Sequence, residues 1–453
     1  MQAPSVNITL PPYVQCALDV LETAGYEAWC VGGCVRDALL GRAINDYDIA
    51  TSALWRETQA AFEAAGFRTH ETTGVKHGTL TVIVDEQALE ITTFRADGTY
   101  SDARHPDNVT FVRTIEEDLA RRDFTINALA YNPTRGLLDC YDGLADLQAG
   151  VIRVVGDGKE RFREDALRIL RGCRFASQLG FSIEPGTLQA MLACKILLQQ
   201  VSAERITHEL QAFLLGDHVH DALMATVDVL AAVIPELMAC KGFDQHTPYH
   251  MYDVLEHTAY VVQNIPAYPL ARWAALFHDL GKPGACFREG DVCHFYGHAK
   301  LSVFIARGIM DRLCLSPAFE ADVLELVRVH DDVIQPTPRT VKRALARIDG
   351  RVDLFRALCD LKRADALSQA PRCAGRVELA NQLDQVLDEI LAADDAFTVK
   401  RLEIDGNDVM ALGVPRGPKV GELLRAALDA VIDEDVPNER ENLLAFLRGQ
   451  LNQ

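Results

Sequence analysis

The sequence predicts an α+β protein: a small N-terminal mixed β-sheet with its helices, followed by an all-α remainder. Short apolar runs bounded by glycines or polar residues dominate the first 145 or so residues, and such runs are typical of buried strands. From Arg161 onward, most segments instead carry apolar residues at helical spacing with short breaks. The length of 453 residues suggests two to four domains.

The elements of the N-terminal part follow one another at short intervals. Gly41 stands where a helical segment would end, a position that glycine favours. In chain order, we predict a buried strand at 26–33, a helix at 34–41, a strand at 45–52, two strands at 79–85 and 88–94 joined by a polar turn around Glu86 and Gln87, and a helix opened by 121–132.

The composition narrows the classes of function. A net charge of −20 and a pI near 5.1 argue against general, sequence-blind coating of nucleic acid. No apolar run is long enough for a transmembrane helix, and the N-terminal residues lack the basic and apolar regions of a signal peptide. The twelve cysteines are scattered without a CxxC pair, as is usual in a reducing compartment. We therefore expect a cytoplasmic protein with no membrane partner.

Two segments are rich in basic residues, although the chain as a whole is acidic. The stretch RRDFTINALAYN at 121–132 places two arginines and an aspartate against an apolar run. Residues 151–176 hold seven Lys/Arg against four Asp/Glu. Cations concentrated within an acidic chain suit a site for a polyanion. The same residues are also compatible with a salt-bridged helix start and a solvated amphipathic helix.

Paired aspartates after a glycine turn form the first candidate site. Asp46 and Asp48 are two residues apart, so on a strand both would point to one face. Two such carboxylates repel unless a cation lies between them, which is how proteins hold divalent metals for phosphoryl chemistry. Glu90 is the candidate third carboxylate, and Gly32 and Gly33 leave bare backbone N–H groups for phosphate oxygens. Each feature alone also fits a solvated strand edge or a plain turn, but their order and spacing favour the functional interpretation.

Three long segments resemble one protein family. The segments GGCVRDALLGRAINDYDIATS, EITTFRADGTYSDARHPDNVTFVRTIEEDLARRDFTINALAYN and DCYDGLADLQAGVIRVVGDGKERFREDALRILRGCRFASQLGF resemble the class II tRNA nucleotidyltransferases. This family comprises the bacterial and eukaryotic CCA-adding enzymes and their poly(A) polymerase relatives, within the DNA polymerase β-like superfamily. The resemblance covers the N-terminal half nearly continuously and is weaker toward the end.

The resemblance implies roles for residues of the first half. Asp46 and Asp48 match the family's catalytic, Mg²⁺-binding pair, with Glu90 as the nearby strand carboxylate. The polyanion would then be a nucleoside triphosphate, with the RNA 3′ end beside it. The family's flexible loop would fall near 97–108. The implied nucleotide-binding residues are Gly32, Gly33, Arg36, Asp37, Arg121, Arg122, Asp123, Asn127, Glu164, Asp165, Arg168, Arg171 and Arg174.

Asp165 and Arg168 form the candidate base-reading pair. They are three residues apart and would share one face of a helix. Cytosine and adenine each present an amino donor beside a ring-nitrogen acceptor, so a carboxylate and a guanidinium match both bases. Uracil and guanine present the opposite pattern and would be left unpaired. The family uses its matching motif in this way, whereas the pair alone also fits an ordinary intrahelical salt bridge.

A second candidate site follows in the segments YHMYDVLEHTAY, ALFHDLGKPG, HFYGHAKLS, VRVHDD and LKRADALS. Their spacing exceeds any local motif, so the nitrogen and oxygen ligands must converge from several helices. HDLGKP and FYGHAKLS resemble the HD phosphohydrolase superfamily, which implies a divalent metal (Ni²⁺, Mn²⁺, Co²⁺ or Mg²⁺) and a phosphatase or phosphodiesterase side activity. The candidate ligands are His257, His278, Asp279 and Asp365 for one metal, with Asp331 as a competitor of Asp365, and His298 and His330 for a second metal.

These resemblances imply four parts. They are a nucleotidyltransferase head at 1–150, a helical neck at 151–225 with the nucleotide-selecting helix and an RNA-binding surface, an HD-type metal domain at 226–370, and a helical, tRNA-binding tail at 371–453. The segment QPTP at 335–338 is a further plausible boundary.

The function that we predict is template-independent addition or repair of the 3′-terminal CCA of tRNA from CTP and ATP, supported by two Mg²⁺ ions. The partner would be the tRNA 3′ end with its acceptor/T arm, and no protein partner is evident. A poly(A) polymerase and a CC-only or A-only adding enzyme are the nearest alternatives. An HD phosphohydrolase whose head only binds RNA belongs to a different class. The acidic charge and the HD motifs favour CCA addition.

Overall fold

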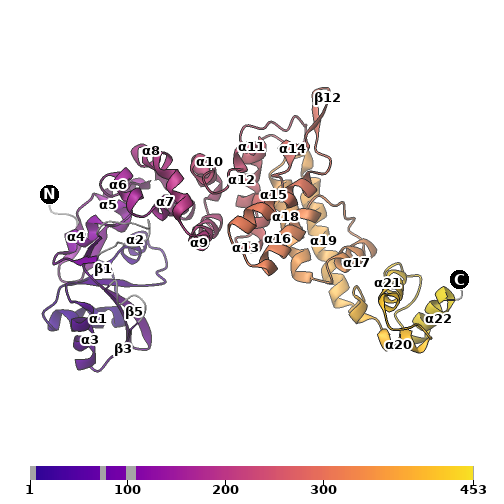
Figure 1. The fold of residues 1–453 in the computed structure, drawn as a ribbon, viewed down its shortest axis with the longest axis horizontal. Coiled ribbons are helices and arrows are strands. Elements are labelled where there is room, and N and C mark those ends of the chain that lie inside the picture. The colour runs from indigo at the N-terminus through magenta and orange to yellow at the C-terminus, as the bar shows by residue number, and fades with distance from the viewer. Residues whose placement is uncertain (1–6, 72–77, 98–108, 452–453) are drawn as a thin grey trace. The chain divides into compact units, whose positions relative to one another are not determined.

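The computed structural model describes residues 7–71, 78–97 and 109–451 (Figure 1). The chain divides into two compact units, Met1–Pro235 and Glu236–Gln453. A mixed sheet with its helices forms the N-terminal part of the first unit, and helices dominate from there on. The predicted α+β class is therefore confirmed. The predicted loop near 97–108 lies almost entirely outside the described residues.

The main sheet has seven strands in the order β3-β4-β5-β2-β1-β8-β9. Strands β2 and β5 pair in parallel, and the other neighbours pair antiparallel. This makes the sheet mixed, as predicted. Its strands are β1 (Ala28–Val31), β2 (Asp48–Thr51), β3 (Arg68–His70), β4 (Thr79–Val84), β5 (Gln87–Thr93), β8 (Leu129–Asn132) and β9 (Gly136–Asp139).

The sheet buries apolar side chains on both faces. Along β1, Cys30 joins a core formed with helices α1 (Pro12–Thr23) and α3 (Trp55–Ala64), whereas Trp29 and Val31 join a second core with α4 (Ile115–Ala120). Successive strand residues point to opposite faces, which explains the alternation. Strand β1 is consequently apolar at every position and fully buried.

Two local predictions differ from the structure. Residues 121–132 do not open a helix, because α4 ends at Ala120 and the apolar run forms a short 3₁₀ turn (Thr125–Asn127) followed by β8. All four β8 residues are buried between β1 and β9, and a short run buried on both faces has no period that separates strand from helix. The turn between β4 and β5 lies one residue earlier than predicted, at Asp85 and Glu86, which both have positive φ as hairpin turns require.

The helical prediction for the remainder is confirmed, with small exceptions among the described residues. These are the parallel pair β10 (Val151–Ile152) and β11 (Ser182–Ile183), and the hairpin β12 (Phe287–Glu289) and β13 (Val292–His294). The other helices of the first unit are α2 (Gly33–Leu39), α5 (Gly143–Ala149), α6 (Gly158–Glu164), α7 (Leu167–Leu179), α8 (Pro185–Cys194), α9 (Ala203–Leu214) and α10 (Val219–Leu230).

The second unit is a helical assembly (Figure 1). Within its described residues and those of the first unit, no helix combines the length and apolar character needed to cross a membrane. Thr337 caps α17 at the predicted QPTP boundary, where its hydroxyl accepts from the Thr340 N–H. The helices are α11 (Leu237–Cys240), α12 (Val254–Asn264), α13 (Pro269–Phe277), α14 (Lys282–Ala285), α15 (His298–Arg312), α16 (Pro317–Val329), α17 (Pro338–Arg347), α18 (Val352–Leu367), α19 (Gly375–Ala392), α20 (Gly406–Ala411), α21 (Pro418–Ile432) and α22 (Arg440–Leu451).

Candidate functional sites

A cavity of about 540 Å³ lies in the first unit and is lined by the sheet, the turn before β8 and helix α7. Eight arginines and five carboxylates line it, so the cavity is locally cationic in an acidic chain. Asp37, Asp46 and Glu164 are predicted site residues that do not line it. The predicted residues that do are Gly32, Gly33, Arg36, Asp48, Glu90, Arg121, Arg122, Asp123, Asn127, Asp165, Arg168, Arg171 and Arg174.

Two carboxylates stand side by side on the sheet floor of this cavity. Asp48 is the first residue of β2, and its register partner on the parallel strand β5 is Glu90. Side chains in register on neighbouring strands share a face, so both carboxylates point into the cavity. Asp46 lies in the loop before β2 and not on the strand, which corrects the prediction that the strand carries both aspartates.

The surroundings of Asp48 fit a bound cation. Burial raises the pKa of Asp48, Arg122 opposes this shift, and the negative charge of Asp46 adds to it. The side-chain oxygens of Asp46, Asp48 and Glu90 do not all lie within 4.8 Å of one another. The donor set consists only of oxygens, which is the type that Mg²⁺ prefers.

The glycine turn before α2 allows an arginine to approach closely. Gly32 has a φ of +75°, a conformation that side chains rarely tolerate. A Cβ at this position would lie 2.7 Å from Nη1 of Arg122. Gly32 therefore serves the cavity by leaving room for a cation beside the backbone.

Asp123 connects the cavity's cations. Its Oδ1 accepts from the Phe124 N–H at 2.8 Å and from Asn127 Nδ2 at 3.0 Å, and its Oδ2 lies 2.7 Å from both Nε and Nη2 of Arg171. Asn127 Oδ1 in turn accepts from Arg36 Nη1 at 2.6 Å. Burial alone would raise the pKa of Asp123, but Arg171 and Asn127 outweigh it and hold this pKa well below its ordinary value. The ionised carboxylate thus fixes two guanidinium groups.

Phe175 contacts the two arginines fixed by Asp123 and a third, Arg174. The guanidinium carbons of Arg36, Arg171 and Arg174 lie 5.1, 5.4 and 4.7 Å from the centre of its ring. The electron-rich face of an aromatic ring attracts cations at such distances. Arg174 also pairs with the buried Glu209 at 3.2 Å. The ring holds three positive groups together that would otherwise repel one another.

Sequence reasoning missed several cavity residues. The buried Asp118 pairs with Arg121 at 2.9 Å and with Arg122 at 3.2 Å. Its spacing of three and four residues from these arginines was a usable helical signal. Arg205 on α9 reaches Asp165 at 3.2 Å from 40 residues away, and no local pattern indicates this contact.

The base-reading pair is arranged differently from the prediction. Asp165 is not on a helix with Arg168, because α6 ends at Glu164 and α7 begins at Leu167, with Asp165 extended between them. The two side chains also have separate partners: Asp165 pairs with Arg205, and Arg168 pairs with Glu164 at 2.7 Å. Both line the same cavity, so the arrangement still offers an acceptor and a donor to one ligand.

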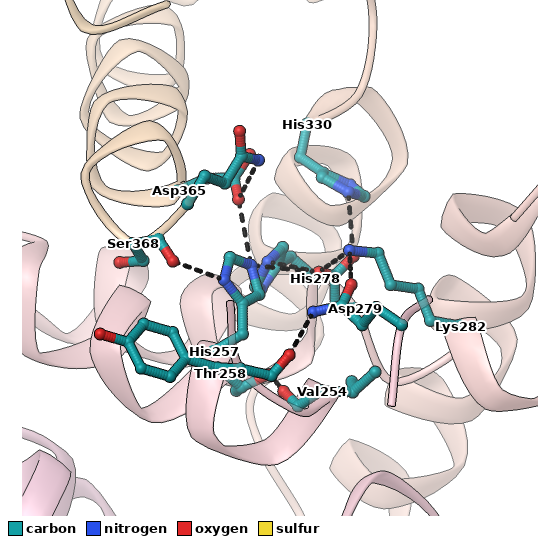
Figure 2. Close-up of polar contacts among 12 residues, drawn as sticks. Val254, His257, Thr258, His278, Asp279, Lys282, His330, Asp365 and Ser368 are labelled. Atoms are coloured by element: carbon teal, nitrogen blue, oxygen red, sulfur yellow. Dashed lines mark hydrogen bonds and ion pairs between the residues drawn. The ribbon is translucent and has the colours of Figure 1, made fainter. Parts of the chain in front are cut away.

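A cluster of histidines and aspartates lies in the second unit (Figure 2). It contains two groups of buried side chains that could hold a metal ion: His257, His278 and Asp279 in one, and Asp279, His298 and His330 in the other. His278 and His330 directly follow α13 and α16, and His298 begins α15. The predicted convergence of ligands from several helices is what the structure shows.

The four histidines share one orientation. Each Nδ1 faces a backbone carbonyl, that of Ser368, Ala275, Phe295 or Val327, at 2.7–3.2 Å. A neutral histidine whose Nδ1 donates to a carbonyl presents an unprotonated Nε2, which is the form that binds metals. The Nε2 atoms of His298 and His330 lie 3.1 Å apart. This packing leaves the four Nε2 atoms facing the cluster.

Asp279 and Asp365 supply the negative charge of the cluster. Asp279 Oδ2 lies 3.1 Å from His278 Nε2, and Asp365 Oδ1 lies 3.1 Å from His257 Nε2 (Figure 2). Burial alone would lower the pKa of His257, but the two carboxylates outweigh it and raise this pKa to about 9. The competing candidate Asp331 is exposed.

The cluster's unsatisfied atoms fit a metal. The Nε2 atoms of His257 and His278 are buried and have no aligned hydrogen-bond partner, although carboxylate oxygens lie close to them. Leaving such atoms unpaired is costly, and a divalent cation would satisfy them together with the carboxylates. The residues present therefore suit the metal that the HD resemblance implies.

Comparison with known proteins places these sites in a family. The family model of the poly A polymerase head domain matches residues 28–153, and that of the probable RNA and SrmB-binding site of polymerase A matches 180–241. The HD domain model matches residues 248–370, and the model of the putative tRNA nucleotidyltransferase domain 2 matches 323–447.

Relatives also match this chain over nearly its whole length. The CCA-adding enzymes of Limosilactobacillus fermentum and Streptococcus thermophilus are each 34% identical, covering 96–97% of this chain and 97–98% of the relatives. The solved Bacillus stearothermophilus CCA-adding enzyme in complex with CTP shares 30% identity and a TM-score of 0.74, with 98% of both chains covered. The Thermotoga maritima CCA-adding enzyme complexed with tRNA, at 20% identity and a TM-score of 0.59, shares the fold. On this full-length identity, the chain belongs to the family of CCA-adding enzymes.

Proposed function

We propose that this protein adds or repairs the 3′-terminal CCA of tRNA from CTP and ATP without a template strand. The observation that carries the proposal is the cavity, lined by eight arginines, in which Asp48 and Glu90 lie in register on neighbouring strands. Such a site suits a triphosphate next to carboxylates that can hold metal ions. The names of the relatives supply the reaction, and the bound CTP of the Bacillus enzyme supports the nucleotide.

Each group of residues has a proposed task. Asp46 and Asp48 would hold Mg²⁺, with Glu90 beside them, and Mg²⁺ when bound supplies a more acidic RNA 3′-hydroxyl and charge compensation on the pyrophosphate. The triphosphate would lie among the guanidinium groups, fixed by Asp123 and its partner Asn127. The proposed phosphate-side residues are Gly32, Gly33, Arg36, Asp37, Arg121, Arg122, Arg171 and Arg174.

Base selection falls to Asp165 and Arg168. The carboxylate would accept from the amino group of C or A, and the guanidinium would donate to the ring nitrogen. Glu164 pairs with Arg168 at 2.7 Å and would orient it. The poly(A) polymerase and the CC-only or A-only alternatives are not favoured, since the relatives described above are CCA-adding enzymes.

The test replaces Asp48, the proposed metal ligand. Asp48→Ala should reduce CTP addition to tRNA lacking CCA to below about a tenth of wild type, because a metal ligand is lost. Asp19→Ala, which removes an exposed aspartate of α1, is the matched control and should keep wild-type addition. Addition by Asp48→Ala at the rate of this control would contradict the assignment.

A second activity is proposed for the HD cluster. The buried Nε2 atoms of His257 and His278 support a divalent metal there, one of Ni²⁺, Mn²⁺, Co²⁺ or Mg²⁺, and with it hydrolysis of phosphoesters such as 2′,3′-cyclic nucleotides. His278→Ala should abolish this hydrolysis while CCA addition persists. If wild type hydrolyses no phosphoester with any of the four metals, the site is structural.

The division at 150, 225 and 370 and the cytoplasmic location are also proposals. The head model that ends at 153 and the HD model that ends at 370 support two of these boundaries, whereas helix α10 spans the boundary proposed at 225. The tail at 371–453 would contact the tRNA acceptor/T arm. Twelve free cysteines support a reducing compartment.

A further inference from the structure

Asp365 is held by residues that follow it in the chain. Gln369 Nε2 donates to both carboxylate oxygens of Asp365, at 3.0 Å each. The amide oxygen of Gln369 accepts from Arg376 Nη1 at 2.8 Å. Because a guanidinium only donates, this contact fixes the amide oxygen toward Arg376 and the amide nitrogen toward Asp365. Both steps therefore donate toward the carboxylate: Arg376 donates to Gln369, and Gln369 donates to Asp365.

Arg376 and Ala370, the residue after Gln369, both contact Tyr249. Gln369 is buried, whereas Arg376 lies on the exposed face of α19 with its guanidinium carbon 5.6 Å from the centre of the Tyr249 ring. The Tyr249 carbonyl accepts from the Ala370 N–H at 2.8 Å. The turn after α18 is thus tied to the segment that precedes α12.

The same turn also orients a histidine of the cluster. The carbonyl of Ser368 faces His257 Nδ1 at 3.2 Å, and His257 Nε2 faces Asp365 Oδ1 at 3.1 Å (Figure 2). Two consecutive residues, Ser368 and Gln369, therefore aim a histidine and a carboxylate at one another. Asp365 needs this support more than Asp279 does, because its side chain is 27% exposed against 3%.

We propose that Gln369 and Arg376 are positioning residues that fix Asp365 beside His257 and thereby set the affinity for a divalent metal on that side of the cluster. This inference rests on the proposed HD metal site. Groups that orient a ligand typically contribute about 10–100-fold to metal affinity. The other ligand group, Asp279 with His298 and His330, makes no contact with Gln369 among the described interactions, so its affinity should not change.

The test is a calorimetric titration of the full chain with Mn²⁺, in which every protein, including the reference called wild type, carries Asp48→Ala to remove the proposed metal ligand of the first unit. Gln369→Met keeps the side-chain length and removes both the donor and the acceptor. We expect one Mn²⁺ site to weaken about 10–100-fold while the second keeps its wild-type affinity. Gln382→Met, on the exposed part of α19, is the matched control and should bind as wild type. Arg376→Met, at an exposed position, should weaken the same site in the same direction and guards against a folding defect in Gln369→Met.

The outcomes distinguish the proposed HD metal site from the proposed positioning role of Gln369 and Arg376. If wild type binds no Mn²⁺, the proposed HD metal site fails and this inference fails with it. If wild type binds Mn²⁺ and both variants bind it equally well, the metal site stands and the positioning role is wrong. If both metal sites weaken together and the thermal unfolding midpoint before addition of Mn²⁺ falls, the residues only support the fold, and the positioning role is again wrong.

Discussion

Asp123→Asn tests how the nucleotide cavity holds its cations. Asparagine keeps the shape of the side chain but loses its charge and replaces one acceptor oxygen with a donor. Whichever way the amide turns, its N–H groups oppose either Arg171 or the donors from Asn127 and Phe124. Losing a hydrogen bond to a charged group costs about 1.5–3 kcal/mol. The Arg171 side chain is 34% exposed, so water replaces part of the lost partner and the cost stays below the ~3–5 kcal/mol of a fully buried pair.

The expected effect is visible in stability and in kinetics. For the 235-residue first unit, about 2–3 kcal/mol corresponds to a drop of roughly 4–12 °C in its Tm. The kcat/KM for CTP should fall at least about tenfold, or ~1.4 kcal/mol, because Arg36 and Arg171 lose their common anchor. Asp157→Asn is the control, since it makes the same change at the exposed N-cap of α6, where asparagine caps equally well.

The fall in Tm at acidic pH provides a second readout for Asp123→Asn. Arg171 and Asn127 hold the pKa of Asp123 below its unfolded value of about 3.9. A carboxyl with a depressed folded pKa stabilises above its unfolded pKa, and this contribution is lost as pH falls through the folded pKa. Wild type should therefore lose Tm more steeply below about pH 4 than Asp123→Asn does. Unchanged Tm, kcat/KM and acid slope would refute the role of Asp123 as an anchor.

Four further substitutions probe the same cavity. Asp165→Ala and Arg168→Ala should slow CTP and ATP addition about tenfold to a hundredfold while raising UTP or GTP addition, measured as kcat/KM for all four triphosphates; a common factor for every nucleotide would contradict base reading. Gly32→Ala should destabilise by about 1–3 kcal/mol and displace Arg122, seen as a lower Tm, and an unchanged Tm would show that the turn adapts. Phe175→Leu should raise the KM for CTP about two- to fivefold through loss of cation–π attraction of ~0.5–1 kcal/mol, unless the arginines hold their places without the ring.

The alternation of polar and apolar residues along a strand predicted part of the site. The rest of the site depends on pairing between strands that are far apart in the sequence. Alternation places Glu90 on the face of β5 opposite Leu89 and Ile91, and the structure agrees. That Asp48 is its direct neighbour depends on the parallel pairing of β2 with β5, which are separated in the chain by β3 and β4. No spacing rule connects them, so the residues alone offered Glu90 only as a candidate third carboxylate, and the resemblance supported that candidate.

The errors have physical causes as well. The segment 129–132 within this run is short and buried on both faces, so its periodicity could not separate a buried strand from a helix. The spacing of Asp165 and Arg168 suggested one helix face, but the chain breaks between α6 and α7 at Asp165. The Arg205–Asp165 contact depends on the packing of α9 near α7, which the sequence does not encode locally.

The central claim is ordered, template-independent CCA addition, and one measurement tests it most directly. The purified protein is incubated with Mg²⁺ and three tRNA transcripts, ending before CCA, after C, or after CC, with each of the four triphosphates supplied singly and CTP with ATP together. The account predicts two C additions on the first transcript, one on the second, A only on the third, and a stop after three nucleotides with CTP and ATP. Repeated A addition without a stop, or addition restricted to C alone or A alone, would contradict it.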